Sequence, residues 1–104
     1  MDELYAKFLP QFITLARSRV ALALAMAAPA GPRDDDTTKK IVRELHTLAG
    51  EAGLLGLREV VPLARECEEK AKLLQLTRAE ADADGLVAAL HMLAGIIEGV
   101  AKKP

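Results

Sequence analysis

Apolar residues recur at steps of three and four positions along the whole chain, and no stretch alternates between β-branched and polar residues. Steps of three and four place side chains on one face of an α-helix, whereas strict alternation is typical of a half-buried strand. Leucine, alanine and valine dominate the apolar positions. The pattern therefore predicts an all-α protein.

Four amphipathic segments follow one another along the chain. They cover approximately residues 2–28, 37–54, 58–76 and 77–102. Pro10 lies inside the first segment, and proline removes a backbone donor and clashes with the preceding helical turn. We therefore expect the first helix to be kinked at Pro10, or to be divided there into a short leading helix and a longer one.

Residues with special backbone roles separate the segments. Asp34–Asp36 offer N-cap oxygens and negative charge to the start of the second helix, and Gly56 marks its end. Pro62 predicts an irregular start of the third helix. Thr77 and Glu80 have the spacing of a capping box, in which two side chains satisfy free amide donors at the start of the fourth helix.

The short connections predict an up-down-up-down antiparallel four-helix bundle that forms one domain over residues 1–104. Of the 104 residues, 51% are hydrophobic and only 3% aromatic, which predicts an aliphatic core. Phe8 and Phe12 are expected to contribute to this core. A chain of this length has little room for a deep cleft. An interaction surface is therefore expected rather than an enclosed pocket.

Charge and cysteine content exclude several classes of function. The 14 basic and 15 acidic residues nearly balance, so we expect neither nucleic acid nor a membrane as partner. Cys67 is the only cysteine, which excludes an intramolecular disulfide, leaves no thiol pair for a metal site, and favours a cytoplasmic location.

The apolar stretch 17–30 is shorter than the roughly 20 residues that cross a bilayer. We expect it to form a buried helix of a monomer.

His46 lies on the exposed side of the second predicted helix. The apolar positions of this helix form one stripe, made of Ile41, Leu45, Leu48, Ala52 and Leu55. At about 100° per residue, His46 points roughly 100–140° away from this stripe, beside Gly50 and Gly53. Each glycine inside a helix costs about 0.8–1 kcal/mol relative to alanine. The glycines thus indicate either close approach of another molecule or fraying of the helix toward Gly56.

The stretch LHTLAGEAGLLGLREVVPLARECEEKA, which begins at Leu45, resembles the histidine-containing phosphotransfer (HPt) domain of bacterial phosphorelays. In that family an exposed histidine is followed at four, seven and ten residues by small residues, and then by a helix with a carboxylate or amide. Here these residues are His46, Gly50, Gly53, Gly56 and Glu68. The resemblance implies that His46 accepts a phosphoryl group on Nε2, that Glu68 orients its ring, and that the glycines leave room for a docking partner.

One position departs from the family pattern. Many family members carry lysine or arginine three residues after the histidine, where this chain has Ala49. Arg43, Lys39 and Arg65 are the candidates to replace that cation, unless they are ordinary solvated surface charges. The resemblance thus implies a partner-docking surface that comprises Gly50, Gly53, Ala49 and these three cations.

His91 and Cys67 are the other two residues whose chemistry could suggest a site. His91 is followed by the same Leu-Ala-Gly pattern as His46, but no later helix could supply an orienting group. His46 is therefore the preferred acceptor, and His91 is expected to be a surface or boundary residue. Cys67 lies between Glu66 and Glu68, whose charges disfavour a thiolate, so a partly buried structural thiol is expected.

The resemblance implies a phosphocarrier that neither makes nor hydrolyses ATP and has no cofactor of its own. Its partners would be a response-regulator receiver domain, which brings magnesium, and a sensor or hybrid histidine kinase. Two alternatives remain open. One is a phosphoacceptor domain from a chemotaxis-type kinase, which Glu68 favours because those members often have glutamate there. The other is a helical interaction scaffold in which His46 is incidental. Met1 and the ending at Pro104 favour a complete small protein.

Overall fold

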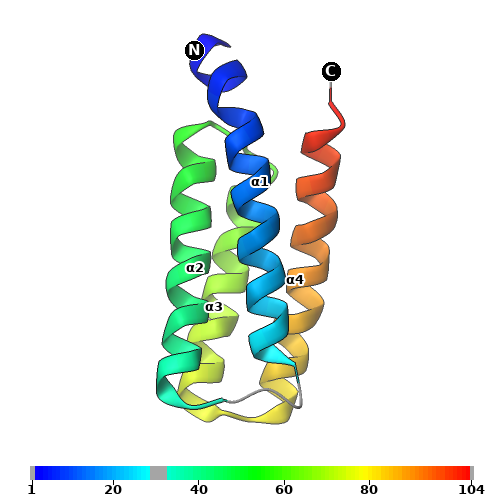
Figure 1. Cartoon of the computed structure of the whole chain (residues 1–104). Helices are drawn as coiled ribbons and strands as arrows, with labels where there is room; N and C mark the ends of the chain where they lie inside the picture. Colours follow the sequence, from blue (N-terminus) through cyan, green and yellow to red (C-terminus); the bar gives the residue numbers. More distant parts are fainter. Residues whose placement is uncertain (1, 29–32, 104) are drawn as a thin grey trace.

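The helices lie side by side in a computed structural model that describes residues 2–28 and 33–103 (Figure 1). In this part of the chain they are α1 (Asp2–Ala27), α2 (Asp35–Leu54), α3 (Val61–Thr77) and α4 (Glu80–Ala101). Contacts join α1 to α2, α2 to α3, α3 to α4 and α4 back to α1, and the most extensive contact is between α2 and α3. The predicted up-down-up-down four-helix bundle is confirmed.

Each helix contributes one apolar stripe to a shared aliphatic core, as the spacing predicts. In α2 the four stripe residues Ile41, Leu45, Leu48 and Ala52 are at most 1% exposed, and Leu55 lies at the edge of the core. Other large and fully buried side chains come from α3 and α4, namely Leu74, Leu86, Leu90, Leu93 and Ile97. His46 follows the buried Leu45, so the core stripe of α2 fixes the direction in which the histidine points.

The first helix runs through Pro10 without a break. The expected division into two helices is therefore wrong. Proline removes only one intrahelical hydrogen bond, and the side chain of Pro10 is exposed. Beyond Pro10, the buried residues Phe12, Ile13 and Ala16 anchor α1 in the core. This packing holds the helix together where backbone propensity alone would end it.

The ends of α2 follow the predicted chemistry closely. The helix begins at Asp35, two residues earlier than expected, and its N-cap Asp34 accepts a hydrogen bond from the Thr37 amide at 2.8 Å. Gly56 adopts a left-handed φ of +68°. The Gly56 amide bonds to the Gly53 carbonyl, and the next amide bonds to the Ala52 carbonyl. This pair of bonds satisfies the last carbonyls of the helix, so Gly56 ends α2 as predicted.

The starts of α3 and α4 differ from the sequence-based expectation. The third helix begins at Val61, three residues later than expected, after the irregular start that Pro62 predicts. The predicted capping box is wrong. Thr77 is the last residue of α3, and the N-cap of α4 is Ala79, which makes no side-chain capping hydrogen bond. The Thr77 hydroxyl accepts from the Ala79 amide and donates to the carboxylate of Asp82.

Candidate functional site

The imidazole of His46 on α2 faces the carboxylate of Glu68 on α3. The distance from Nδ1 to Oε2 is 2.9 Å, and the side chain of His46 is 74% exposed whereas that of Glu68 is 9% exposed. A carboxylate only accepts hydrogen bonds, so Nδ1 is the donor. In the neutral ring this fixes the proton on Nδ1 and leaves the lone pair on Nε2. The geometry thus presents an oriented nucleophile at the surface.

The burial of Glu68 follows from its place on α3. The residue lies directly after Cys67 and one turn beyond Ala64, both of which are fully buried. A carboxylate at the edge of an aliphatic core is costly unless it has hydrogen-bonding and charged partners. The Nδ1–H of His46 is one such partner, and the ammonium of Lys72, one turn further along α3, is 3.6 Å from the same Oε2.

The two glycines of α2 next to His46 are exposed, and packing within the described chain does not require either of them. A Cβ atom added to Gly50 or to Gly53 would meet no other heavy atom within 4 Å. Both residues nevertheless cost helix stability relative to alanine. Contacts within the described structure thus give no reason for glycine at these two positions, and the space beside the histidine is open.

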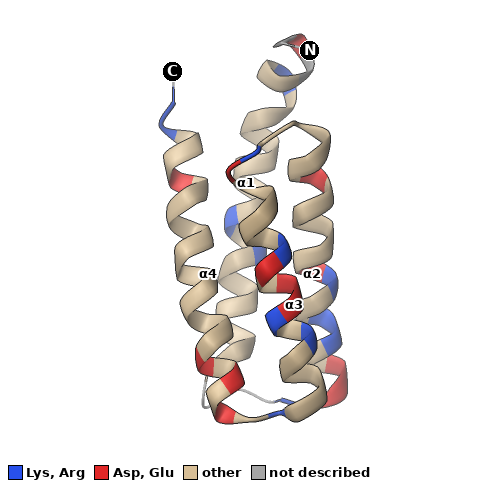
Figure 2. Ribbon diagram, turned by 180° about the vertical axis from the view of Figure 1, so that it is seen from behind, with Lys and Arg blue, Asp and Glu red and all other residues tan. Residues whose placement is uncertain are grey.

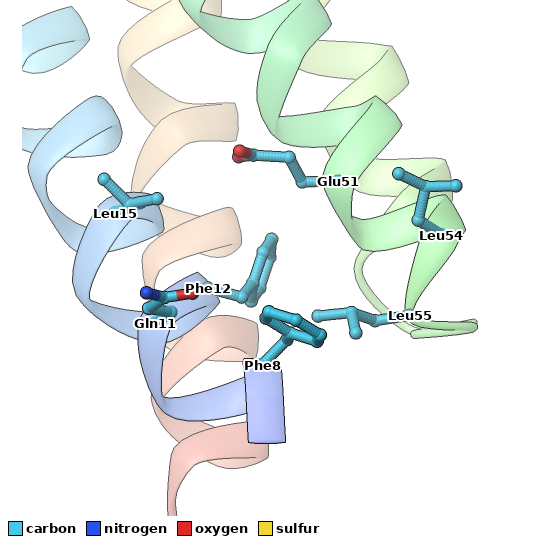
Figure 3. A pocket seen from close by; sticks show the side chains of 7 residues that line it. All are labelled: Phe8, Gln11, Phe12, Leu15, Glu51, Leu54 and Leu55. Atoms are coloured by element: carbon cyan, nitrogen blue, oxygen red, sulfur yellow. The ribbon is translucent and has the colours of Figure 1, made fainter. Parts of the chain in front are cut away.

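An apolar groove lies between α1 and the end of α2 (Figure 3). The groove has a volume of about 320 Å³, and its lining residues are Phe8, Gln11, Phe12, Leu15, Glu51, Leu54 and Leu55. Leu54 is 80% exposed and follows Gly50 by four residues, so it extends the row that starts at His46. Phe12 is buried as expected, but Phe8 is 38% exposed and lines the groove. The expectation that Phe8 fills the core is wrong.

Glu51, in the wall of this groove, belongs to an ionic link between α1 and α2. Arg19 on α1 bonds to the carboxylates of Glu44 at 2.9 Å and Glu51 at 3.4 Å, and its side chain is only 19% exposed. The spacing along α2 gave no sign of this link, because the arginine comes from another helix. The link fixes α1 against the helix that carries the histidine.

The other residues predicted for the docking surface differ in burial and in their partners. Ala49 is 2% exposed, so its assignment to the docking surface is wrong. Its methyl group packs in the core of the bundle, beyond the reach of a partner. Lys39 pairs with Asp35 at 3.0 Å. Arg43 and Arg65 are exposed, and no ion pair joins either of them to Glu68 among the residues that the structure describes.

The cation that the structure does place at the His46–Glu68 pair is Lys72, which the sequence analysis missed. Its Nζ lies 3.6 Å from Oε2 of Glu68 and 3.7 Å from Oε2 of Glu69. The i, i+4 spacing from glutamate to lysine on a helix is the signal that could have found it. That signal gains meaning only once Glu68 is known to contact the histidine.

Cys67 and His91 lie apart from this chemistry. Cys67 is fully buried, and this burial raises the pKa of its thiol from 9.0 to about 12, with a further contribution from Glu66. The thiol is thus more deeply buried than expected, and its raised pKa disfavours the thiolate. His91 is exposed on α4, and no hydrogen bond to its side chain occurs within the described ranges. Unlike His46, it has no carboxylate to orient its ring.

Charged residues gather on α2 and α3, whereas the middle of α4 has none (Figure 2). By length and composition α4 could cross a membrane. However, Leu86, Leu90 and Leu93 of α4 are fully buried in the bundle. A helix with this burial is typical of a protein core. Packing in the bundle therefore accounts for the leucines on the buried face of α4.

The fold and site define a helical bundle that presents an oriented histidine at its surface. The family model that matches the chain is the Hpt domain, over residues 5–98, and the chain therefore belongs to the Hpt domain family. Hpt domains take part in histidine phosphotransfer in two-component phosphorelays, where they interact with receiver and kinase domains. The searches of curated proteins and of solved structures gave no match.

Proposed function

We propose that this protein is a phosphorelay intermediate in which His46 is the phosphoryl carrier. It accepts a phosphoryl group from the aspartate of a receiver domain or from a kinase, and it passes the group to a receiver aspartate. The observation that carries the proposal is the contact of 2.9 Å between Nδ1 of the exposed His46 and the nearly buried carboxylate of Glu68. This contact makes Nε2 the free nucleophile.

The transfer step is a nucleophilic displacement at phosphorus. The lone pair of Nε2 attacks the phosphorus, the bond from phosphorus to the aspartyl oxygen breaks, and its electron pair leaves with the carboxylate of the donor. The Nδ1 proton stays on the ring of His46 and remains hydrogen-bonded to Glu68. The phosphorylated ring carries a positive charge, which the carboxylate stabilises. Donation to a receiver is the reverse reaction, and magnesium is bound by the acidic residues of the receiver.

The partner docks on α2. An in-line transfer requires the donor aspartate to approach Nε2 closely, and the open space beside Gly50 and Gly53 permits that approach. The interface extends from His46 past Gly50 to Leu54, which lines the apolar groove. The groove then buries side chains of the receiver. Such an interface is small and transient, as transfer between successive partners requires.

The chain is proposed to act as a cytoplasmic monomer without a nucleic-acid or membrane partner, which agrees with its nearly balanced charge. It binds no cofactor of its own. The phosphoryl group and the magnesium both come with the partner proteins.

The proposal is tested by incubation with a phosphorylated receiver domain and magnesium, or with a hybrid kinase and ATP. Phosphohistidine is labile in acid and stable in base, which distinguishes it from phosphoaspartate. We expect label on the wild-type chain and on the His91→Gln variant but none on His46→Gln, which keeps its fold because the side chain is exposed. Label on His46→Gln would show that the acceptor lies elsewhere.

A second candidate function is that of a phosphoacceptor domain of a chemotaxis-type kinase. The specific observation in its favour is that the group bonded to His46 is a carboxylate rather than an amide. A kinase catalytic core with ATP would then label His46 faster than any phosphorylated receiver does. Faster labelling by receivers favours the relay intermediate.

A further inference from the structure

The side chain of Lys72 is the one described cation that contacts the carboxylate that orients His46. Its Nζ is 3.6 Å from Oε2 of Glu68, the same oxygen that lies 2.9 Å from Nδ1 of the histidine. The lysine is half exposed, at 50% of its side-chain surface. One carboxylate oxygen thus links a surface ammonium to the ring of the nucleophile.

The contacts of Lys72 are too long to hold the ammonium firmly in place. Charge-assisted hydrogen bonds between nitrogen and oxygen are about 2.7–2.9 Å long, whereas the Lys72 contacts to Glu68 and Glu69 are 3.6 and 3.7 Å. A lysine side chain also has four rotatable bonds, which let its ammonium move between neighbouring anions. A phosphoryl group with two negative charges would be a stronger attractor than either carboxylate.

The other candidate cations have no ion pair with the carboxylate of Glu68 among the residues that the structure describes. Lys39 is held by Asp35 at 3.0 Å, on the turn where α2 begins. Neither Arg43 nor Arg65 has an ion pair with the Glu68 carboxylate in the described part of the chain. Position 49, three residues after the histidine, is a buried alanine and offers no charge. Among the described residues, Lys72 is the cation that forms an ion pair with Glu68.

We propose that Lys72 contacts the phosphoryl group on His46: its ammonium lies beside Glu68 in the resting protein and turns to the phosphoryl oxygens when Nε2 is phosphorylated. This inference rests on the proposed function. The contact neutralises charge on the phosphoryl oxygens as the bond from Nε2 to phosphorus forms. It involves no proton transfer, because the ammonium acts only as a charged hydrogen-bond donor and the Nδ1 proton stays on the ring of His46, hydrogen-bonded to Glu68. A cation from α3 thereby takes the place of one that α2 lacks.

The test measures labelling by phosphoramidate, a small phosphoryl donor that needs no docking surface, so that effects on the chemistry are separated from effects on partner binding. The variants are Lys72→Met, Lys72→Arg and, as a matched control, Lys40→Met, which removes the same charge from an exposed position of α2. The ¹⁵N spectrum of the unphosphorylated His46 ring reports whether the Nδ1–H tautomer is retained. A phosphorylated receiver serves as second donor, and thermal melting checks the fold.

We expect labelling of Lys72→Met to be about tenfold slower than that of the wild type, the size of one lost charge-assisted hydrogen bond. Lys40→Met should stay within about twofold of wild type, since a solvated charge contributes little. Lys72→Arg should recover most of the rate, and the tautomer of His46 should be unchanged in all variants. A Lys72→Met rate equal to that of Lys40→Met would overturn the inference.

Two further outcomes are distinct from this one. A changed His46 tautomer in Lys72→Met, with equally slow labelling of Lys72→Arg, would show that the lysine acts only by holding Glu68, and this too would overturn the contact to the phosphoryl group. A wild-type chain that neither donor labels would overturn the proposed function itself, and the inference with it.

Discussion

Replacement of Gly50 separates what the fold needs from what the partner needs. The residue lies inside α2 and is exposed, and a Cβ atom at this position would meet nothing within 4 Å. Gly50→Ala should therefore stabilise the protein by about 0.8–1 kcal/mol, the difference in helix propensity. For a domain near 100 residues this raises Tm by about 4–8 °C. Gly50→Gln should give most of the same gain, since glutamine is also a good helix former.

The same substitution should slow transfer from a protein partner. A glutamine side chain occupies the space beside Nε2 that the receiver needs, and a misplacement of about 1 Å in an in-line reaction can cost about 100-fold in rate. We expect Gly50→Gln to react 10- to 100-fold more slowly with a phosphorylated receiver, an estimate taken from that same sensitivity. With phosphoramidate, which needs no docking, its rate should match that of the wild type.

Thermal unfolding and two transfer time courses, one with each donor, are sufficient for this assay. A fall in Tm for Gly50→Ala would mean that the glycine has a packing role that the structure does not show. An undiminished rate of Gly50→Gln with every receiver would refute the argument that the exposed glycines exist for close approach.

Three further predictions follow from the same geometry. Glu68→Ala should keep His46 as the acceptor but slow its labelling about tenfold or more, the size of a lost charge-assisted hydrogen bond. Glu68→Gln should be intermediate, because an amide oxygen still accepts a hydrogen bond. A wild-type rate for Glu68→Ala in the phosphoramidate assay would remove Glu68 from the mechanism. Leu54→Glu places a charge in the mouth of the groove and should weaken receiver binding, measured by calorimetry, without changing labelling by phosphoramidate; equal binding would exclude the groove from the interface. Burial raises the pKa of Cys67 from 9.0 to about 12, so its thiol ionises in the unfolded chain at a lower pH than in the folded protein. The contribution of Cys67 to the free energy of unfolding should therefore be fully present below about pH 9 and be lost as the pH rises from about 9 toward 12. A Cys67→Ala variant with the same alkaline unfolding curve would contradict this assignment.

Local patterns were sufficient to predict the elements that depend on local chemistry. The apolar spacing gives the four helices, and Asp34 and Gly56 give the ends of α2, because caps involve residues a few positions apart. Thr77 shows the limit of such rules. Arg78 adopts a left-handed conformation at the end of α3, and α4 begins after Ala79, so Thr77 lies two residues before the N-cap position that its spacing indicates.

Features that depend on packing between helices were not predictable from spacing alone. Pro10 stays inside a helix because residues beyond it are buried in the core. Phe8 and Phe12 share a helical spacing, but only Phe12 faces the bundle interior. The burial of Ala49 depends in the same way on which neighbouring helix its face meets. Each outcome is decided by the angular position of a neighbouring helix, which the sequence does not specify locally.

The sequence predicted the pairing of His46 with Glu68 but not the cations that lie beside the carboxylates of α2 and α3. His46 and Glu68 were paired by resemblance, and the structure places their side chains 2.9 Å apart. Lys72 was missed because its relevance depends on Glu68 turning toward α2 rather than on any spacing relative to the histidine. Arg19 was missed for the same reason, since its partners Glu44 and Glu51 lie on another helix.

The measurement that most directly tests the central claim is a long-range ¹H–¹⁵N spectrum of the His46 ring, recorded before and after labelling. We predict a proton on Nδ1 in both states and a coupling of phosphorus to Nε2 of His46 after labelling. Phosphorus coupled to Nδ1 of His46, or to either nitrogen of His91, would contradict it.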